Sequence, residues 1–309
     1  LGNPNVNTNK KEKITTEDEE VMYMHGTHAG GIISGKSNSK GYYSICPQCL
    51  ILPIKVVEYQ RGKAVIKDSS IIKALYYISL INNYSNDKIK IINMSFGKRE
   101  NSKAITLLLN NLNKSKNNIL VVASAGNNNS SAPIFPASLE NVLSVGATSS
   151  DGKKSLYSNY GSWVDVFAPG GGRNITGKYL HGIISTAPEN FFTESIGTSI
   201  SAPIVSGLAG LLLSINKDLT PKELSWIIKS TAKSKKNIDP TTPYLINAKK
   251  AIELAYRHTH TTKDPPYNNK KCGCNITSLA KLSFVNIIFI YLLLALPCLF
   301  ALILLYRLC

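Results

Sequence analysis

Three short motifs contain the side chains that acyl-transfer chemistry would need. The first, "ESIGTSISAPIVSG" over residues 194–207, places Ser199 directly before a run of small and apolar residues that predicts a helix. A serine at a helix N-terminus lies where backbone N–H groups and the helix dipole stabilise negative charge, which suits a nucleophilic hydroxyl. Taken alone, the motif favours a simpler explanation, in which a hydroxyl only caps the helix.

The other two motifs supply a base and an amide. "HGTHAGGIISG" places His25 at the start of a second helix rich in small residues, where an imidazole can act as a general base. "VVASAGNNN" ends a predicted strand at Asn127, whose amide can donate to a developing oxyanion together with the Ser199 N–H. Singly, His25 suits a structural histidine and Asn127 a turn residue. Together and in this order, the three motifs indicate a hydrolytic site.

Strands and helices that alternate along the chain are expected to position these motifs. Short apolar runs rich in β-branched residues predict buried strands over 51–57, 88–96, 118–126 and 141–148. Amphipathic patterns predict helices over 69–81 and around 105–112, and "TPKELSWIIKST" predicts a helix with Thr220 as N-cap and Glu223 closing a capping box. Strands alternating with helices predict a parallel sheet covered on both faces.

From about residue 25 to residue 254 the chain resembles the subtilisin family of serine endopeptidases. The resemblance rests on "HGTHAGGIISG", "INMSFG", "VVASAGN", "FPASLENVLSVGAT", "YSNYGSWVDVFAPGG" and "GTSISAPIVSGLAGLLLS", in that order. It implies a subtilisin-like three-layer α/β fold, with a parallel sheet flanked by helices. It also implies that Ser199 is the nucleophile, His25 the general base and Asn127 the oxyanion donor of a serine-type endopeptidase. Supporting roles then fall to three further residues: His28, Thr198 and Ser201.

The resemblance also implies where a substrate would bind. The strand end at Ser95, Phe96 and Gly97 would pair with an extended substrate backbone, a form of β-augmentation. Ala125 and Gly126 would form the opposite wall of the primary specificity pocket. A protein or peptide is therefore the expected partner.

The resemblance further implies a third catalytic residue, an aspartate on the first core strand. Asp18 is the only aspartate before His25, and its acidic, polar surroundings predict a surface loop rather than a strand. Because Leu1 is not a plausible start, we expect a piece of a longer protein whose aspartate lies upstream. The alternative is an inactive relative, a subtilisin-like peptide-binding or scaffold protein that lacks the triad aspartate.

The composition allows a large domain and does not by itself indicate a partner. The chain has 309 residues, of which 43% are hydrophobic, and this is enough for one sizeable α/β core. The excess of 35 basic over 19 acidic residues gives a net charge of +16, which would suit an anionic partner. The lysines are dispersed and no recognition motif accompanies them, so we expect a solvated face and no nucleic-acid partner.

A long apolar segment near the C-terminus predicts a membrane anchor. Residues 283–306 contain no charged side chain and are numerous enough to cross the hydrocarbon core as one transmembrane helix. We therefore expect a polar segment over 1–24, the catalytic domain over 25–258, a stalk over 259–282, the helix over 283–306 and a short tail over 307–309. The expected protein is a single-pass membrane protein with its catalytic domain on the luminal or extracellular side and a lipid bilayer as partner.

Two cysteine motifs leave alternatives open. "CPQC" over 46–49 lacks a second metal-binding half, which favours a loop disulfide or plain loop cysteines. "CGC" over 272–274 could bind zinc with His258 and His260, or could lie in an unstructured stalk.

The expected chemistry needs no cofactor and no metal. The family resemblance allows structural calcium and a propeptide, although no acidic cluster in the sequence marks a calcium site. The Asn-, Lys- and Ile-rich composition with a terminal anchor resembles the subtilisin-like processing proteases of apicomplexan parasites.

Overall fold

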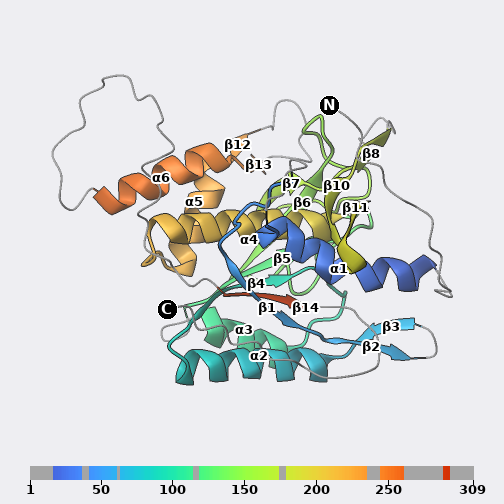
Figure 1. Ribbon diagram of the computed structural model, residues 1–309, viewed down its shortest axis with the longest axis horizontal. Coiled ribbons are helices and arrows are strands. Elements are labelled where there is room, and N and C mark those ends of the chain that lie inside the picture. The colour runs from blue at the N-terminus through green and yellow to red at the C-terminus, as the bar shows by residue number, and fades with distance from the viewer. Residues whose placement is uncertain are drawn as a thin grey trace.

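A computed structural model describes residues 17–36, 42–60, 63–113, 118–173, 179–234, 244–260 and 288–292. An eight-stranded sheet forms its centre, and helices cover both faces of that sheet (Figure 1). In spatial order its strands are β1 (Leu50–Ile54), β14 (Ile288–Leu292), β4 (Ile89–Met94), β5 (Leu120–Ser124), β6 (Val142–Thr148), β7 (Val166–Pro169), β13 (Tyr244–Leu245) and β12 (Lys233–Ser234). All neighbours are parallel except β12 and β13.

Two groups of helices complete a three-layer α/β architecture. One face of the sheet packs against α2 (Asp68–Tyr84) and α3 (Lys103–Asn113), and the other against α1 (Glu17–Ser34), α4 (Thr198–Ile215), α5 (Pro221–Thr231) and α6 (Ala248–His260) (Figure 1). Because both faces are covered, almost every side chain of β4, β5 and β6 is buried, as in other parallel sheets. The predicted fold class is therefore confirmed at the level of sheet and helices.

The predicted capping box of α5 is present. Thr220 accepts a hydrogen bond from the Glu223 N–H, and the Glu223 carboxylate accepts one from the Thr220 N–H. Each contact satisfies a backbone donor that has no acceptor within the helix.

Three small hairpins lie outside the main sheet. They are β2 (Val57–Gln60) with β3 (Lys63–Ile66), β8 (Gly172–Arg173) with β9 (Tyr179–Leu180), and β10 (Ile183–Ala187) with β11 (Phe191–Ser195), the last pair joined by the short helix η1 (Pro188–Asn190). The β10–β11 hairpin leads directly into α4. The Nε2 atom of buried His28 lies 3.0 Å from the carbonyl oxygen of Ile183 and 3.2 Å from that of Thr193, which ties this hairpin to α1.

The first helix begins earlier than the sequence predicts. We expected a surface loop around Asp18 and a helix starting at His25, but α1 starts at Glu17 and places His25 in its middle. The helix also continues across residue 24, where we expected the catalytic domain to begin.

Part of the predicted transmembrane helix is a strand in the structure. Of residues 283–306, the structure describes only Ile288–Leu292, and these form β14 between β1 and β4. In this structure these five residues form a strand in place of the predicted helix. Their apolar, β-branched and aromatic side chains suit a strand, and the two neighbours supply hydrogen-bond partners along both edges. The remaining residues of the predicted helix, the stalk beyond His260 and the "CGC" motif lie outside the described residues.

Among the described residues, α4 is the one helix whose length and apolarity would suffice to cross a membrane. Most of its surface is buried inside the protein, against the sheet and α6. This burial explains why α4 is apolar almost all round, as the central helix of a globular domain is expected to be.

Candidate active site

One cavity of about 300 Å³ gathers the predicted catalytic residues. It lies where β4 and β5 end and α4 begins. Seven of the eight predicted site residues line it: His25, Ser95, Phe96, Gly97, Gly126, Asn127 and Ser199. The eighth, Ala125, is fully buried and packs with Val164 and Phe167 instead. Ala125 therefore contributes only backbone to this region.

The turn before α4 sets the position of Ser199. Gly197 has a φ of 143°, a conformation that favours glycine. Its N–H lies 3.0 Å from the carbonyl oxygen of Gly170 and 2.9 Å from the hydroxyl oxygen of Tyr157, which fixes the turn. A Cβ atom at Gly197 would lie 3.0 Å from Ser199 Oγ and 3.4 Å from Asn127 Nδ2. The hydroxyl and the amide nitrogen therefore lie close together beside this glycine.

Hydrogen bonds from Thr198 orient the side-chain amide of Asn127. The Oδ1 atom of Asn127 accepts from the Thr198 N–H at 2.9 Å and from the Thr198 hydroxyl at 2.8 Å. The same hydroxyl accepts from the Gly126 N–H at 3.0 Å, so its own proton is directed at Asn127. Since two donors occupy Oδ1, the opposite end of the amide, Nδ2, is the end that can donate to a substrate.

Two donors for an oxyanion thus lie at the start of α4. One is Nδ2 of Asn127, and the other is the N–H of Ser199, which is too close to the helix start to have an acceptor within the helix. The positive end of the helix dipole adds to their effect. This arrangement can stabilise negative charge on the oxygen of a carbonyl group attacked by Ser199.

His25 is the only titratable side chain among the described residues that line the cavity. Burial lowers the pKa of His25 to about 4, with a smaller contribution from the neighbouring His28. The imidazole is therefore neutral at pH 7, the form that a general base needs, but it is a weak base. Among the acidic residues whose side chains the structure describes, none acts on it. A carboxylate beside the ring would raise this pKa.

A chain of hydrogen bonds supports the backbone of Ser199. Ser95 donates from its hydroxyl to the carbonyl oxygen of Ser199 at 2.8 Å. Asn93 donates from Nδ2 to the Ser95 hydroxyl at 2.9 Å, and the Ser206 hydroxyl donates to Asn93 Oδ1 at 3.0 Å. The contacts of Asn93 and Ser206 were not predicted from the sequence. A polar residue inside the apolar run "KIKIINMSF" was the signal that could have indicated the first of them.

The loop after α1 contains a disulfide. Cys46 and Cys49 are bonded to each other, which confirms the loop-disulfide interpretation of "CPQC". The Cys46 N–H donates to the carbonyl oxygen of Ile33 at 2.7 Å, so the loop is attached to the end of the helix that carries His25. Within the described residues no group of three His, Cys, Asp or Glu side chains could hold a metal ion.

Fold and site together define an α/β protein that carries the side chains of a serine hydrolase. A family model described as "Subtilase family" matches residues 2–273, and the chain belongs to this family.

Named relatives agree with this assignment. The chain is 36% identical over 199 residues to a thermophilic serine proteinase of Bacillus sp. (strain AK1), and the match covers 64% of the chain and 44% of the relative. It is 33% identical over 228 residues to an extracellular basic protease of Dichelobacter nodosus, covering 69% of the chain and 36% of the relative. The chain thus spans less than half the length of these two relatives.

The fold is also similar to solved structures of proteases. A protease from Pseudoalteromonas arctica PAMC 21717 matches with a TM-score of 0.62 and 27% identity, covering 75% of this chain and 70% of that one. The protease domain of PatA, solved as a mutant, matches with a TM-score of 0.61 and 27% identity, covering 78% of this chain and 83% of that one.

Proposed function

We propose that the protein is a serine-type endopeptidase. The Ser199 hydroxyl attacks a peptide carbonyl while His25 takes up its proton, and the oxyanion accepts hydrogen bonds from Asn127 Nδ2 and the Ser199 N–H. His25 then gives the proton to the leaving amine, and an ester remains on Ser199. Water, deprotonated by His25, hydrolyses this acyl-enzyme. The observation that carries the proposal is the fixed amide of Asn127 beside Ser199 at the start of α4.

Two chain segments would hold the peptide substrate. Ser95–Gly97 follows β4 and Gly126 follows β5, so both segments lie at the same edge of the sheet and line the same cavity. An extended peptide between them would pair its backbone with one segment and place a side chain between the two. The family relatives named as proteases act on proteins, which supports this substrate class.

Efficient catalysis requires a carboxylate beside His25. We propose that it comes from a segment outside the described residues, because none of the described acidic side chains acts on this ring. The same observation favours a second candidate function, an inactive subtilisin-like protein that binds peptides or serves as a scaffold. Without the carboxylate, the imidazolium formed during the reaction would lack its stabilising partner.

Cleavage of internally quenched peptides by the full-length protein separates the two candidates. An endopeptidase cleaves internal bonds, and Ser199→Ala abolishes cleavage. Ser214→Ala is the matched control, because it removes a hydroxyl at the other end of α4 that donates to the Leu211 carbonyl oxygen. A folded, propeptide-free protein without cleavage activity would favour the scaffold function instead.

We also propose that residues 283–306 anchor the protein in a membrane, with the catalytic domain on the luminal or extracellular side. Their number and the absence of charge support the proposal. Since Ile288–Leu292 cannot belong to β14 and to a membrane helix at once, the anchored state is one in which this segment leaves the sheet.

Truncation after residue 282 tests the anchor. We expect the full-length protein to resist extraction by carbonate and the truncated one to become soluble while still unfolding cooperatively. A truncated protein that fails to fold would instead indicate that β14 is an essential strand of the sheet.

No cofactor is needed for the proposed chemistry. From the family resemblance and the composition we further propose a propeptide, structural calcium and a processing role of the apicomplexan type.

A further inference from the structure

We propose that Ile134 closes the substrate cavity and restricts cleavage to bonds that follow a small, uncharged residue such as glycine, alanine or serine. The inference rests on the proposed endopeptidase function and names the substrate class of the same site. Ile134 lies in the loop between β5 and β6 and lines the cavity that also contains Ser199.

The side chain of Ile134 occupies the gap between the two walls of the cavity. Its Cγ2 atom lies 2.5 Å from the place that a Cβ atom of Gly97 would take, and its Cγ1 atom lies 3.5 Å from the corresponding place at Gly126. Gly97 belongs to the wall that follows β4, and Gly126 to the wall that follows β5. The isoleucine is thus close to both walls, and it is only 8% exposed.

This gap is where the side chain of the attacked residue would have to lie. Gly126 precedes Asn127, and its N–H donates to the Thr198 hydroxyl, so this wall adjoins both the oxyanion donor and the nucleophile. A substrate carbonyl held between Ser199 and Asn127 would point its own residue's side chain into the adjacent space between the walls. The branched side chain of Ile134 already takes up the inner part of that space.

Hydrogen bonds hold the segments on both sides of the gap in place. Buried Asn159 holds the wall after β5, because its Nδ2 donates to the Ala125 carbonyl oxygen while its Oδ1 accepts from the N–H groups of Asn128 and Ser130. The loop of Ile134 is held on the other side, where Lys98 and Phe135 exchange two backbone hydrogen bonds of 2.8 and 2.9 Å.

The chemistry of the gap disfavours charged side chains as well as large ones. Apart from the neutral imidazole of His25, the described residues that line the cavity have no ionisable side chain. The nearest ammonium along the chain, that of Lys98, forms an ion pair of 2.6 Å with Asp68. A charged side chain in the gap would lose water without gaining an opposite charge.

Peptidyl phosphonate probes that label the catalytic serine test the inference on the full-length protein. Two probes differ only in the residue next to phosphorus, which is alanine in one and phenylalanine in the other. We expect the alanine probe to label Ser199 at least about tenfold faster, as pocket size alone can achieve. In Ile134→Ala we expect the ratio of the labelling rate with the phenylalanine probe to that with the alanine probe to rise by about tenfold or more. Ile134→Val, which keeps most of the side chain, is the matched control.

Each outcome decides one question. Equal labelling rates of the native protein with both probes would overturn the inference. An Ile134→Ala variant whose labelling rate rises by the same factor with both probes would also overturn it. Labelling by the alanine probe shows that a variant is folded. If Ile134→Ala does not fold, the inference is tested by the preference of the native protein for the alanine probe over the phenylalanine probe. If neither probe labels Ser199 in the native protein, the proposed function itself fails, and the inference fails with it.

Discussion

At the scale of single residues, Thr198 controls which end of the Asn127 amide faces the substrate. Its hydroxyl and its N–H both donate to Asn127 Oδ1, and the hydroxyl also binds the Gly126 N–H. The motif "GTS" predicts a serine at a helix start, but it does not reveal this contact, because the two partners are 71 residues apart in the sequence.

We predict that Thr198→Val lowers kcat by about tenfold or more and changes KM little, because it loosens an oxyanion donor without removing it. Removal of such a donor in subtilisin itself costs about 10²–10³-fold in kcat, which sets the upper limit. Thr198→Ser keeps the hydroxyl and should restore most of the rate. Steady-state kinetics of the native protein and the two variants measure these rates. An equal loss of kcat in both variants would contradict this role of the hydroxyl.

Burial of His25 links stability to pH. The pKa of His25 is about 4 in the folded protein and about 6.5 in an unfolded chain, so between these values the unfolded state binds more protons. The stabilising contribution is therefore fully present above pH 6.5 and is lost as the pH falls toward 4. It amounts to about 3 kcal/mol at most. The pKa of His28 is also lowered by burial, which acts in the same direction.

Urea unfolding between about pH 7 and pH 4.5 tests this linkage. We expect the free energy of unfolding to fall with pH, and the slope to be smaller in His25→Gln, which cannot be protonated. An unchanged slope in this variant would mean that the pKa of His25 is the same in the folded and unfolded states, which would contradict its lowering by burial.

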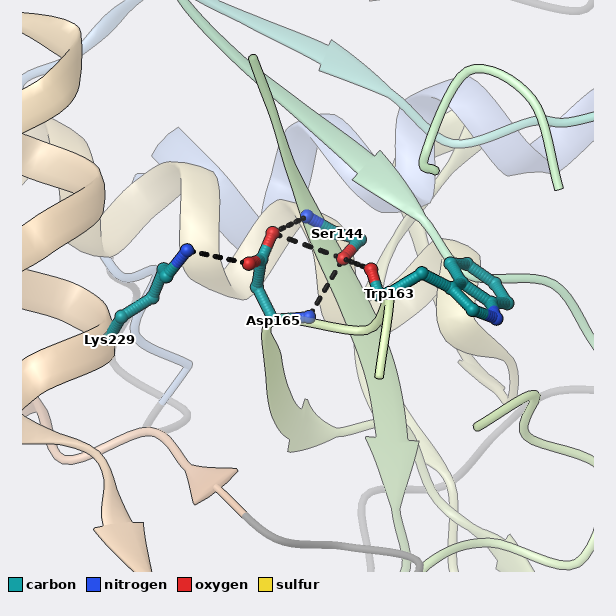
Figure 2. Close-up of polar contacts among 4 residues, drawn as sticks. All are labelled: Ser144, Trp163, Asp165 and Lys229. Carbon is teal, nitrogen blue, oxygen red and sulfur yellow. Dashed lines mark hydrogen bonds and ion pairs between the residues drawn. The ribbon is translucent and has the colours of Figure 1, made fainter. Parts of the chain in front are cut away.

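At the scale of elements, Asp165 joins three parts of the fold at the amino end of β7. Figure 2 shows its carboxylate between Lys229 of α5 and Ser144 of β6, with Trp163 beside them. Asp165 Oδ2 accepts from the Ser144 N–H at 3.0 Å and from its hydroxyl at 3.1 Å, and Oδ1 lies 2.7 Å from Lys229 Nζ. The Ser144 hydroxyl also lies 2.6 Å from the carbonyl oxygen of Trp163.

We predict that Asp165→Ala destabilises the protein by about 1–3 kcal/mol, because it leaves the buried N–H of Ser144 without its acceptor. Lys229→Met should cost less than about 1 kcal/mol, since the Lys229 side chain is 48% exposed and an exposed ion pair contributes little. Chemical denaturation measures both. Equal losses would show that the ion pair, rather than the hydrogen bonds, holds these elements together.

The elements that local patterns specify were predictable. The buried strands β4, β5 and β6 follow from continuous apolar runs, and α5 follows from its capping box. The early start of α1 was missed, because a run of acidic residues favours a helix start as well as a surface loop. Strand β14 was missed because its residues suit a membrane helix equally well, and only pairing with β1 and β4 makes them a strand.

At the scale of the whole molecule, a parallel sheet brings distant motifs to one edge. The segments after β4 and β5 and the start of α4 lie at the carboxyl ends of the strands, where ligands bind in open α/β sheets. The family resemblance of the motifs indicated which residues meet at this edge. It could not predict the supporting contacts of Asn93, Asn159 and Ser206, which depend on the packing of segments far apart in the sequence.

Labelling of the full-length, propeptide-free protein with a fluorophosphonate probe, followed by mapping of the labelled peptide, tests most directly whether Ser199 is the nucleophile. We expect covalent labelling of Ser199, loss of labelling in Ser199→Ala, and strongly slowed labelling in His25→Ala. A folded protein that is not labelled, or that is labelled at another residue, would contradict the assignment of Ser199 as the nucleophile.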